Sequence, residues 1–381
     1  MLDPRVTELA EILVNYSTKV KKGDTVLIHG VGLETLPIVK QLHKLALLRG
    51  AKLVKYEFIV PDIELDFYNL AKPSQAAYQR PHELEFMKSV DCFIGVRSPE
   101  NSMVFANAEV KNMQAAQKAT HAILDERVRN SRWVVTRFPT QGAAQDAKMS
   151  LEQFTEFFFR ATCIDYPALR KHQQQLVRIM SRTDQVQIKS ADTDLRFSIK
   201  GIGAVNCCGE RNVPDGEVFS APVRDSVEGY LTYNCPSIYQ GREFNNVRLE
   251  FSKGKIVKAE AGALSAELNK VFDTDPGARY IGEFAIGTNH AITTPMRNIL
   301  FDEKIGGSIH FTPGMAYDET DNGNRSAVHW DLVKVLKPEY GGGEIWFDNK
   351  LIQRNGEFVH SKLLALNPPK AAKAKGRRKK N

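Results

Sequence analysis

The chain has 381 residues, of which 42% are hydrophobic and 25% are charged. This composition excludes an intrinsically disordered chain, which would be poorer in apolar residues, and no apolar run approaches the ~18 residues of a membrane span. The length is typical of two domains. The first residues, Met1-Leu2-Asp3-Pro4-Arg5, lack the pattern of a signal peptide. We therefore expect a soluble cytoplasmic protein.

The net charge of +7 resides in the C-terminal tail. Residues 367–381 contain seven Lys and Arg residues and no acid, which accounts for the whole excess and leaves the rest of the chain formally neutral. Pro368-Pro369 followed by Lys, Ala, Arg and Gly predicts a disordered segment. The tail either makes weak contact with nucleic acid or another polyanion, or serves only solubility.

The five cysteines argue against a structural disulfide or zinc framework. Their number is odd and no CxxC pair occurs. Buried free thiols in a reducing compartment are the simplest interpretation.

The first part of the chain alternates helix and strand patterns. Apolar residues at helical spacing predict a first helix from Leu2 to Tyr16, which ends at Lys21-Lys22-Gly23. Strands are predicted at residues 25–29, 52–60, 91–96 and 133–136, and further helices at about 34–50, 108–119, 151–162 and 166–181. Strands separated by helices of this length indicate βαβ units and a parallel sheet covered on both faces.

The pattern changes at Gln185. Short runs that alternate apolar and polar residues follow, separated by Gly-containing turns and interrupted by one helix at about 263–271. This predicts a mostly antiparallel β-rich domain. We predict an α/β domain over residues 1–183, a catalytic, metal-binding β-rich domain over 184–366, for the reasons given below, and the disordered tail over 367–381.

Common nucleotide and hydrolase motifs are absent or incomplete. Gly30-Val31-Gly32 follows the first strand, but Thr35 stands where a dinucleotide fingerprint needs a third Gly, so a tight turn competes with a nucleotide site. The sequence contains no GxxxxGK[ST] phosphate loop, no GxSxG elbow and no HExxH motif.

The chemistry-bearing residues gather in the second part. Acids, histidines and one tyrosine stand in apolar or Gly-rich surroundings at Glu217, Glu283, Asp302, Glu303, His310, Tyr317, His329 and Asp331. Each acid alone is more typical of a turn or the surface than of a site. Together they predict a metal site, because ionised carboxylates are costly to bury unless paired or metal-bound.

The pair His329-x-Asp331 is the most informative of these residues. In a strand, residues two apart point the same way. Val328, Trp330 and Leu332 would then face a core, while an imidazole and a carboxylate stand side by side, which suits borderline divalent cations. Five or six N and O donors exceed what one four-coordinate zinc needs, so two ions are favoured.

At these residues the chain resembles the M29 aminopeptidases, the aminopeptidase T or thermophilic leucyl aminopeptidase family. The matching runs are 212–222 (NVPDGEVFSAP), 282–287 (GEFAIG), 301–304 (FDEK), 308–310 (SIH) and the pattern Asn324-x-Ser326-x-x-His329-x-Asp331. The motifs occur in order with consistent gaps. The resemblance covers about residues 1 to 360 and is looser in the α/β part.

The resemblance implies a set of metal ligands, namely Glu217, Glu283, His310, His329 and Asp331. Glu303 occupies an acidic position of the family, as ligand or base, and Tyr317 matches the active-site tyrosine. The tract from Tyr317 to His329 is shorter than in some members. The family's metal is exchangeable among cobalt, zinc and related ions.

The implied mechanism uses two cations that share Glu283 and hold a water between them. Tyr317 would donate a hydrogen bond to the oxyanion, and Glu303 would pass a proton to the leaving amine. Peptides with a free N-terminus would be the substrates, and the family suggests a homodimer. Two alternatives stay open: a metal-dependent hydrolase of another amide or ester, and a non-catalytic metal-binding protein whose tail contacts nucleic acid.

Overall fold

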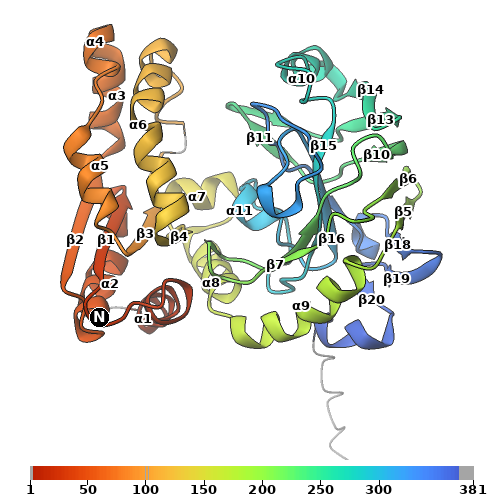
Figure 1. Ribbon diagram of the computed structural model, residues 1–381, viewed down its shortest axis with the longest axis horizontal. Coiled ribbons are helices and arrows are strands. Elements are labelled where there is room, and N and C mark those ends of the chain that lie inside the picture. The colour runs from red at the N-terminus through yellow and green to blue at the C-terminus, as the bar shows by residue number, and fades with distance from the viewer. Residues whose placement is uncertain (1–2, 99, 102, 369–381) are drawn as a thin grey trace, which may run out of the picture.

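The computed structural model describes residues 3–98, 100–101 and 103–368. A helix-rich lobe and a sheet-rich lobe lie side by side, and α8 (Leu151–Thr162) and α9 (Tyr166–Met180) lead from one to the other (Figure 1). No helix in the described part of the chain combines the length and apolarity needed to cross a membrane. The predicted basic tail lies outside the described residues from Pro369 onward.

The first lobe is built on a five-stranded parallel sheet. Its strands, in the order β2-β1-β3-β4-β8, are β2 (Leu53–Ile59), β1 (Thr25–Val31), β3 (Cys92–Arg97), β4 (Arg132–Thr136) and β8 (Asn212–Val213). The four longer strands confirm the predicted ones. The added strand β8 comes from beyond residue 183, so one element crosses the domain boundary that we predict there.

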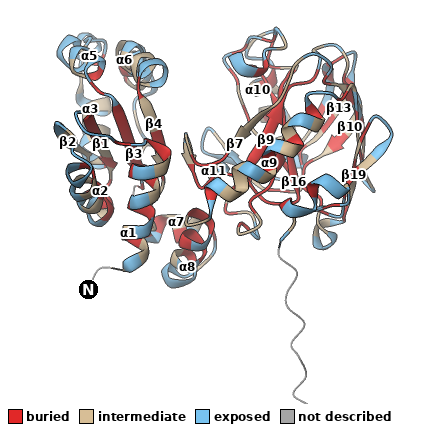
Figure 2. Ribbon diagram, turned by 60° about the horizontal axis from the view of Figure 1, so that its bottom comes forward, coloured by how far each residue is buried: buried red, intermediate tan, exposed pale blue. Residues whose placement is uncertain are grey.

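Both faces of this sheet are covered because its strands are apolar on both faces. Val26 and Ile28 belong to the same core as the helices that precede and follow β1, whereas Leu27 packs with Phe93 and Met87 on the other face. The central strands β1 and β3 are buried between helices in Figure 2, whereas the edge strand β2 is partly exposed. The covering elements are α1 (Pro4–Glu11), the π-helical η1 (Ile12–Ser17), η2 (Leu33–Thr35), α2 (Leu36–Leu48), α3 (Pro61–Leu70), α4 (Pro73–Ala76), α5 (Pro81–Lys88), α6 (Val110–Asn130) and α7 (Gln141–Asp146).

Several helix bounds differ from those predicted. The first helical segment ends at Ser17, six residues before Gly23. Helix α6 continues to Asn130, because residues 120–130 hold no Pro or Gly that would end it. The prediction omitted α3, α4 and α5, although each begins with a proline, which is favoured at the first helical position.

The second lobe is the predicted antiparallel domain and holds two stacked sheets. An eight-stranded sheet has the order β14 (Lys255–Glu260), β13 (Arg248–Ser252), β10 (Glu228–Thr232), β6 (Thr193–Ser198), β5 (Gln185–Ser190), β18 (Glu344–Phe347), β19 (Lys350–Arg354) and β20 (Glu357–Phe358). A five-stranded sheet, called the site sheet below, has the order β17 (Val333–Val335), β16 (Ser308–Pro313), β15 (Ile281–Gly287), β9 (Glu217–Ser220) and β7 (Val205–Cys207).

The remaining elements of this lobe are short. They are the hairpin β11 (Ser237–Tyr239) and β12 (Arg242–Phe244), the helices α10 (Ser265–Phe272) and α11 (Ile299–Asp302), and the 3-10 turns η3 (Gly262–Leu264), η4 (Asp318–Thr320), η5 (Pro338–Tyr340) and η6 (Ser361–Leu366).

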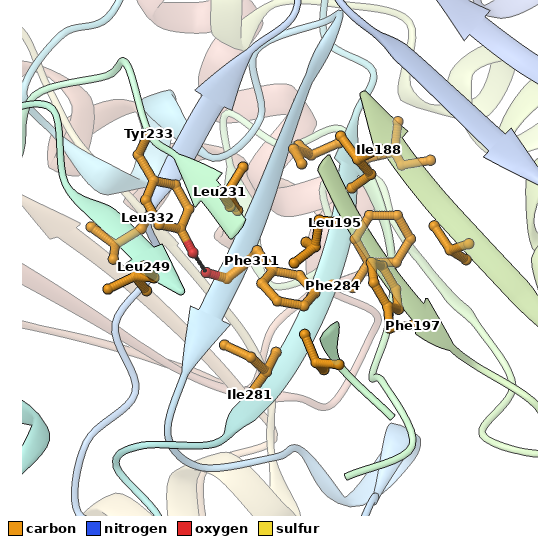
Figure 3. Close-up of a cluster of buried hydrophobic side chains, with 14 of the residues drawn as sticks. Ile188, Leu195, Phe197, Leu231, Tyr233, Leu249, Ile281, Phe284, Phe311 and Leu332 are labelled. Carbon is orange, nitrogen blue, oxygen red and sulfur yellow. Dashed lines mark hydrogen bonds between the residues drawn. The ribbon is translucent and has the colours of Figure 1, made fainter. Parts of the chain in front are cut away.

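The core of this lobe lies between the two sheets. Phe197 of the eight-stranded sheet packs against Phe284 and Phe311 of the site sheet, with ring centroids 4.9 and 5.0 Å apart (Figure 3). The buried hydroxyl of Tyr233 donates to the carbonyl oxygen of Phe311 at 2.7 Å. One face of the site sheet is therefore apolar and fixed, and the opposite face is left for polar groups.

Candidate active site

Strand register gathers three predicted site residues on the polar face of the site sheet. Ala285 pairs with both His310 and Phe219, and Gly287 pairs with Glu217. Because side chains alternate, Glu217, Glu283 and His310 project from the face opposite Phe284. Their exposed fractions are 5%, 3% and 1%. The strands thus hold two carboxylates and one imidazole out of water.

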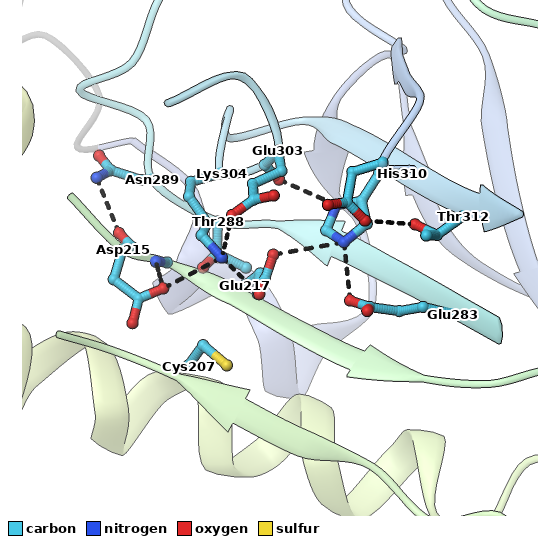
Figure 4. Close-up of polar contacts among 12 residues, drawn as sticks. Cys207, Asp215, Glu217, Glu283, Thr288, Asn289, Glu303, Lys304, His310 and Thr312 are labelled. Carbon is cyan, nitrogen blue, oxygen red and sulfur yellow. Dashed lines mark hydrogen bonds and ion pairs between the residues drawn. The ribbon is translucent and has the colours of Figure 1, made fainter. Parts of the chain in front are cut away.

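The first donor group consists of Glu217, Glu283 and His310, whose ligand atoms lie within 4.8 Å of one another. His310 Nε2 lies 2.9 Å from Glu283 Oε1 and 3.5 Å from Glu217 Oε2 (Figure 4). The other ring nitrogen, Nδ1, donates to the carbonyl oxygen of Glu303 at 3.2 Å. In a neutral ring this bond leaves the Nε2 lone pair directed at two carboxylates, an arrangement that needs a proton or a cation between them.

The second donor group consists of Glu283, His329 and Asp331. His329 Nε2 lies 3.3 Å from Asp331 Oδ1 and 3.6 Å from Glu283 Oε2. As in the first group, His329 Nδ1 donates to a backbone carbonyl, that of Met315, at 2.9 Å. Thr312 Oγ1 donates to Asp331 Oδ1 at 2.7 Å. The two oxygens of Glu283 therefore serve different groups.

The predicted strand around His329 is an extended segment and not a ladder strand. Its one backbone bridge joins His329 to Gly314, and β17 begins only at Val333. The predicted alternation nevertheless holds, because extended backbone alternates its side chains with or without a neighbouring strand. Val328, Trp330 and Leu332 are buried in the core, while His329 and Asp331 face Glu283.

A buried lysine that the sequence analysis did not single out is at the centre of the acidic cluster. Lys304 Nζ lies 2.6 Å from Glu217 Oε1, 2.8 Å from Glu303 Oε1 and 3.6 Å from Asp215 Oδ1. Its exposed fraction is 1%. The only signal in the sequence was its position next to Glu303 in the matched 301–304 run. Cys207 joins Asp215 and Glu217 in a third set of donor atoms, where both carboxylates already lie beside the ammonium group of Lys304.

The charges of the site do not balance without cations. Five carboxylates, those of Asp215, Glu217, Glu283, Glu303 and Asp331, surround one lysine and two histidines. Burial lowers the pKa of His310 and His329. The neighbouring carboxylates outweigh burial and raise the pKa of each imidazole to about 10, so both rings carry an extra proton. Burial raises the pKa of Glu303 to about 8 despite Lys304. Glu217 Oε2 is buried and accepts no hydrogen bond.

Tyr317 stands at the open side of the second donor group. Its ring centroid lies 4.7 Å from that of His329 and 5.8 Å from that of Phe219, and 46% of the residue is exposed. The structure thus brings together the predicted site residues except Asp302, whose carboxylate instead accepts hydrogen bonds from the backbone N–H groups of Met296 at 2.5 Å and Asn298 at 3.1 Å. It adds Lys304, Asp215 and Thr312 as neighbours that neutralise or orient the predicted ones.

Two polar residues tie this site to the helices between the lobes. Gln173 Nε2, from α9, donates to the carbonyl oxygen of Glu217 at 3.1 Å. Asn289 Nδ2 donates to the carbonyl oxygens of Ala161 in α8 at 3.1 Å and of Asp215 at 3.0 Å. The backbone at Asp215 and Glu217 is therefore held by side chains of Asn289 and Gln173.

Several known proteins are similar to this chain along most of its length. The chain is 26% identical to aminopeptidase 2 of Geobacillus stearothermophilus over 384 residues, covering 87% of this chain and 91% of the relative. The structure of AmpT from Thermus thermophilus superposes with a TM-score of 0.80 at 22% identity, covering 94% of this chain and all of AmpT. A 2,5-dihydroxypyridine dioxygenase from Pseudomonas putida KT2440 has the same fold, with a TM-score of 0.63 at 16% identity over 94% of this chain and 98% of that one.

The last comparison shows that the fold alone does not decide the chemistry. The sequence does: residues 2–358 match the family described as thermophilic metalloprotease (M29). The match includes every residue of the two donor groups. The chain belongs to the M29 family of metal-dependent peptide hydrolases.

Proposed function

We propose that the protein is a metallo-aminopeptidase that removes the first residue of peptides with a free N-terminus. The observation that carries the proposal is the sharing of Glu283 between two donor groups, each completed by a histidine and a second carboxylate. The names of the relatives and the family match support the same activity. The proposal includes two divalent ions for each chain, zinc, cobalt or a similar metal.

The donor sets fit two such ions. Glu217, Glu283 and His310 would hold one, and Glu283, His329 and Asp331 the other. Both histidines are oriented by Nδ1–H bonds to backbone carbonyls, the usual arrangement of metal-binding imidazoles. The buried Glu217 Oε2 lacks a hydrogen-bond donor, as an atom reserved for a cation would. Mixed carboxylate and imidazole donors suit zinc and cobalt.

When bound, divalent ions polarise a peptide carbonyl and lower the pKa of water toward about 7. The chain's own residues supply the remaining functions. Tyr317, held against His329 and Phe219, would donate a hydrogen bond to the oxyanion that develops on the scissile carbonyl. Glu303 would carry a proton to the leaving amine. Lys304 keeps Glu217 and Glu303 in place and prevents the cluster from accumulating further negative charge.

The test is a pair of chromogenic substrates. Metal-depleted protein reloaded with zinc or cobalt should release p-nitroaniline from leucine p-nitroanilide and not from its N-acetylated form. EDTA should abolish the rate, and elemental analysis should find two ions for each chain. Cleavage of both substrates at similar rates would point to a general amide hydrolase. Activity that survives complete metal removal would overturn the proposal.

The predicted homodimer, cytoplasmic location and polyanion contact of the tail stay predictions. Sedimentation equilibrium of the full chain tests the homodimer. Binding of a single-stranded oligonucleotide to the full chain, and to a variant that lacks residues 367–381, tests the polyanion contact.

A further inference from the structure

A pocket of about 360 Å³ lies between the two lobes and reaches the second donor group. Asp331 and Val333 line it on the side of the site sheet, and Arg97 and Arg137 line it on the side of the parallel sheet. Arg97 ends β3, and Arg137 directly follows β4. The pocket therefore opens at the carboxyl edge of the parallel strands, where open α/β sheets commonly bind ligands.

The two arginines line one side of this pocket, whose lining also includes the carboxylates of Asp146, Asp302 and Asp331. Arg137 donates to the carbonyl oxygen of Arg97 at 3.3 Å, and in the described part of the chain no carboxylate forms an ion pair with either guanidinium group. Asp146 lines the same pocket and attracts Arg137 only at longer range. Arg297, which also lines it, is paired with Glu243 at 2.8 Å. Arg97 and Arg137 thus differ from Arg297 in lacking an acidic partner.

The two guanidinium groups repel each other, and the smaller attraction of Asp146 for Arg137 offsets this repulsion only in part. Burial lowers the pKa of Arg137, and the charge of Arg97 lowers it further. Both groups stay charged, because a guanidinium is not deprotonated in proteins. Two neighbouring guanidinium forks match the planar geometry of a carboxylate, to which arginine binds through two parallel hydrogen bonds.

We propose that Arg97 and Arg137 bind a carboxylate of the peptide whose N-terminus lies at the donor groups, so that the enzyme favours short peptides with a free C-terminus. The inference rests on the proposed function and specifies its substrate class. The pocket volume lies near the lower end of the 300–1,000 Å³ typical of small-molecule sites, which suits a dipeptide or tripeptide. The carboxylate is either the C-terminal group or an acidic side chain.

The experiment compares Leu-Gly-Gly with its C-terminal amide on the metal-loaded enzyme. We expect kcat/KM for the acid to exceed that for the amide by about 10-fold to 100-fold, the range expected for one hydrogen bond to a charged group. Arg97→Gln and Arg137→Gln should each reduce the rate on the acid much more than the rate on the amide. Arg137→Lys should keep part of the preference, since it retains the charge but not the fork.

Two controls separate recognition from folding and from the source of the carboxylate. Arg129→Gln, at an exposed position of α6 and remote from the pocket lining, should keep the full preference. Leu-Glu-amide and Leu-Gln-amide, compared in the same way, report an acidic side chain. Faster cleavage of Leu-Glu-amide than of Leu-Gln-amide, with this preference lost in Arg97→Gln and Arg137→Gln, would show that the arginines bind an acidic side chain instead of the C-terminal carboxylate.

The outcomes that overturn the proposal are distinct from those that overturn the aminopeptidase activity. Equal rates on all acid and neutral pairs, or an equal loss on both members in the pocket variants, would reject carboxylate recognition while the activity stands. If no peptide is cleaved by the metal-loaded protein, the proposed function fails. Calorimetry then tests carboxylate recognition separately, by comparing the affinities of Leu-Gly-Gly and its amide. Equal affinities would reject carboxylate recognition in the pocket.

Discussion

Strand β3, at the centre of the parallel sheet, and strand β15, at the centre of the site sheet, are both buried along nearly their whole length. The buried side chains of β3 are apolar, so its burial contributes directly to stability. Strand β15 is buried to the same extent but carries Glu283 among Ile281, Phe284 and Ile286. A buried carboxylate costs free energy unless cations or hydrogen bonds compensate it.

The compensation for this cost comes from outside the strand. His310 from β16 meets one oxygen of Glu283, and His329 from an extended loop meets the other. The two sheets therefore use burial differently: the parallel sheet stabilises the fold, whereas the site sheet excludes water around charges. This difference separates substitutions that should affect stability from those that should affect activity.

The largest expected effect is that of Glu283→Gln. This substitution keeps the shape of the side chain but removes the charge that both donor groups share. We expect the loss of both ions and a fall in kcat of about 10³-fold or more, since a metal supplies several kcal/mol of transition-state stabilisation. Ile94→Val in β3 is the matched control. It should cost about 0.5–1.5 kcal/mol of stability and leave kcat unchanged. Equal metal content in parent and Glu283→Gln would contradict the shared role.

Lys304→Met should cause the next largest effect, this time on stability. The variant leaves Glu217, Glu303 and Asp215 buried without their cation, and breaking a buried pair in this way costs about 3–5 kcal/mol. Lys334→Met is the matched control, because Lys334 is equally buried but its partner Asp192 is 47% exposed and can be solvated. Urea unfolding of both metal-free variants measures the contrast. Similar losses would show that the acidic cluster is not what makes Lys304 necessary.

Tyr317→Phe tests the proposed oxyanion donor. Removing one such donor typically lowers kcat by about 10²–10³-fold, whereas KM should change little because the ground-state carbonyl needs the bond less. The ring contacts with His329 and Phe219 remain in the variant, so metal content should persist. Steady-state kinetics at verified metal occupancy provide the measurement. A kcat within about threefold of the parent would show that Tyr317 only lines the site and does not donate to the oxyanion.

Sequence patterns predicted the parallel sheet and the antiparallel domain, and the resemblance to the M29 aminopeptidases implied the residues of both donor groups. Glu217, Glu283 and His310 are candidates because an acid or a histidine stands among apolar or Gly-rich residues, and of these only the run around Glu283 is interpreted as a strand. Sequence patterns did not reveal Lys304, since one lysine in an Asp-Glu-Lys run is indistinguishable from a surface residue until the fold buries it. Strand β8 was equally hidden: two residues carry no periodicity, and only tertiary pairing with β4 defines them.

The Arg97 and Arg137 pair illustrates a second limit. Each arginine lies at the end of a predicted strand, but 40 positions separate them, and only the parallel order of β3 and β4 brings them together. Local periodicity predicts that a strand exists and does not predict its neighbours. Charge clusters built across strands therefore emerge from topology, whereas the His329 and Asp331 pair was visible because its members are two residues apart.

The smallest expected effect is a pH dependence that again compares the two lobes. Burial, with a further contribution from Lys337, lowers the pKa of His290 to about 4. The folded state then binds fewer protons than the unfolded state between about pH 4 and 6.5. Stability from this group is complete above that window and is lost as the pH falls through it. In metal-free protein, the free energy of unfolding of His290→Gln should fall by about 2 kcal/mol less than that of the parent when the pH drops from 7.5 to 5.0.

His29 in β1 is the matched comparison from the parallel sheet. Burial lowers its pKa as well, and Arg97 and Arg127 lower it further, but the carboxylate of Glu57, whose contribution is larger than that of either arginine, opposes this shift. The charged neighbour of His290 is a lysine, which adds to the effect of burial. His29→Gln should therefore flatten the pH dependence in the same direction and by less. Urea unfolding at the two pH values measures the free energy of unfolding of both variants. The difference between each variant and the parent isolates the contribution of that histidine, because the groups of the site titrate in both proteins. A steeper acid loss in either variant, or a larger effect at His29, would contradict the assignment of these shifts to burial and neighbouring charge.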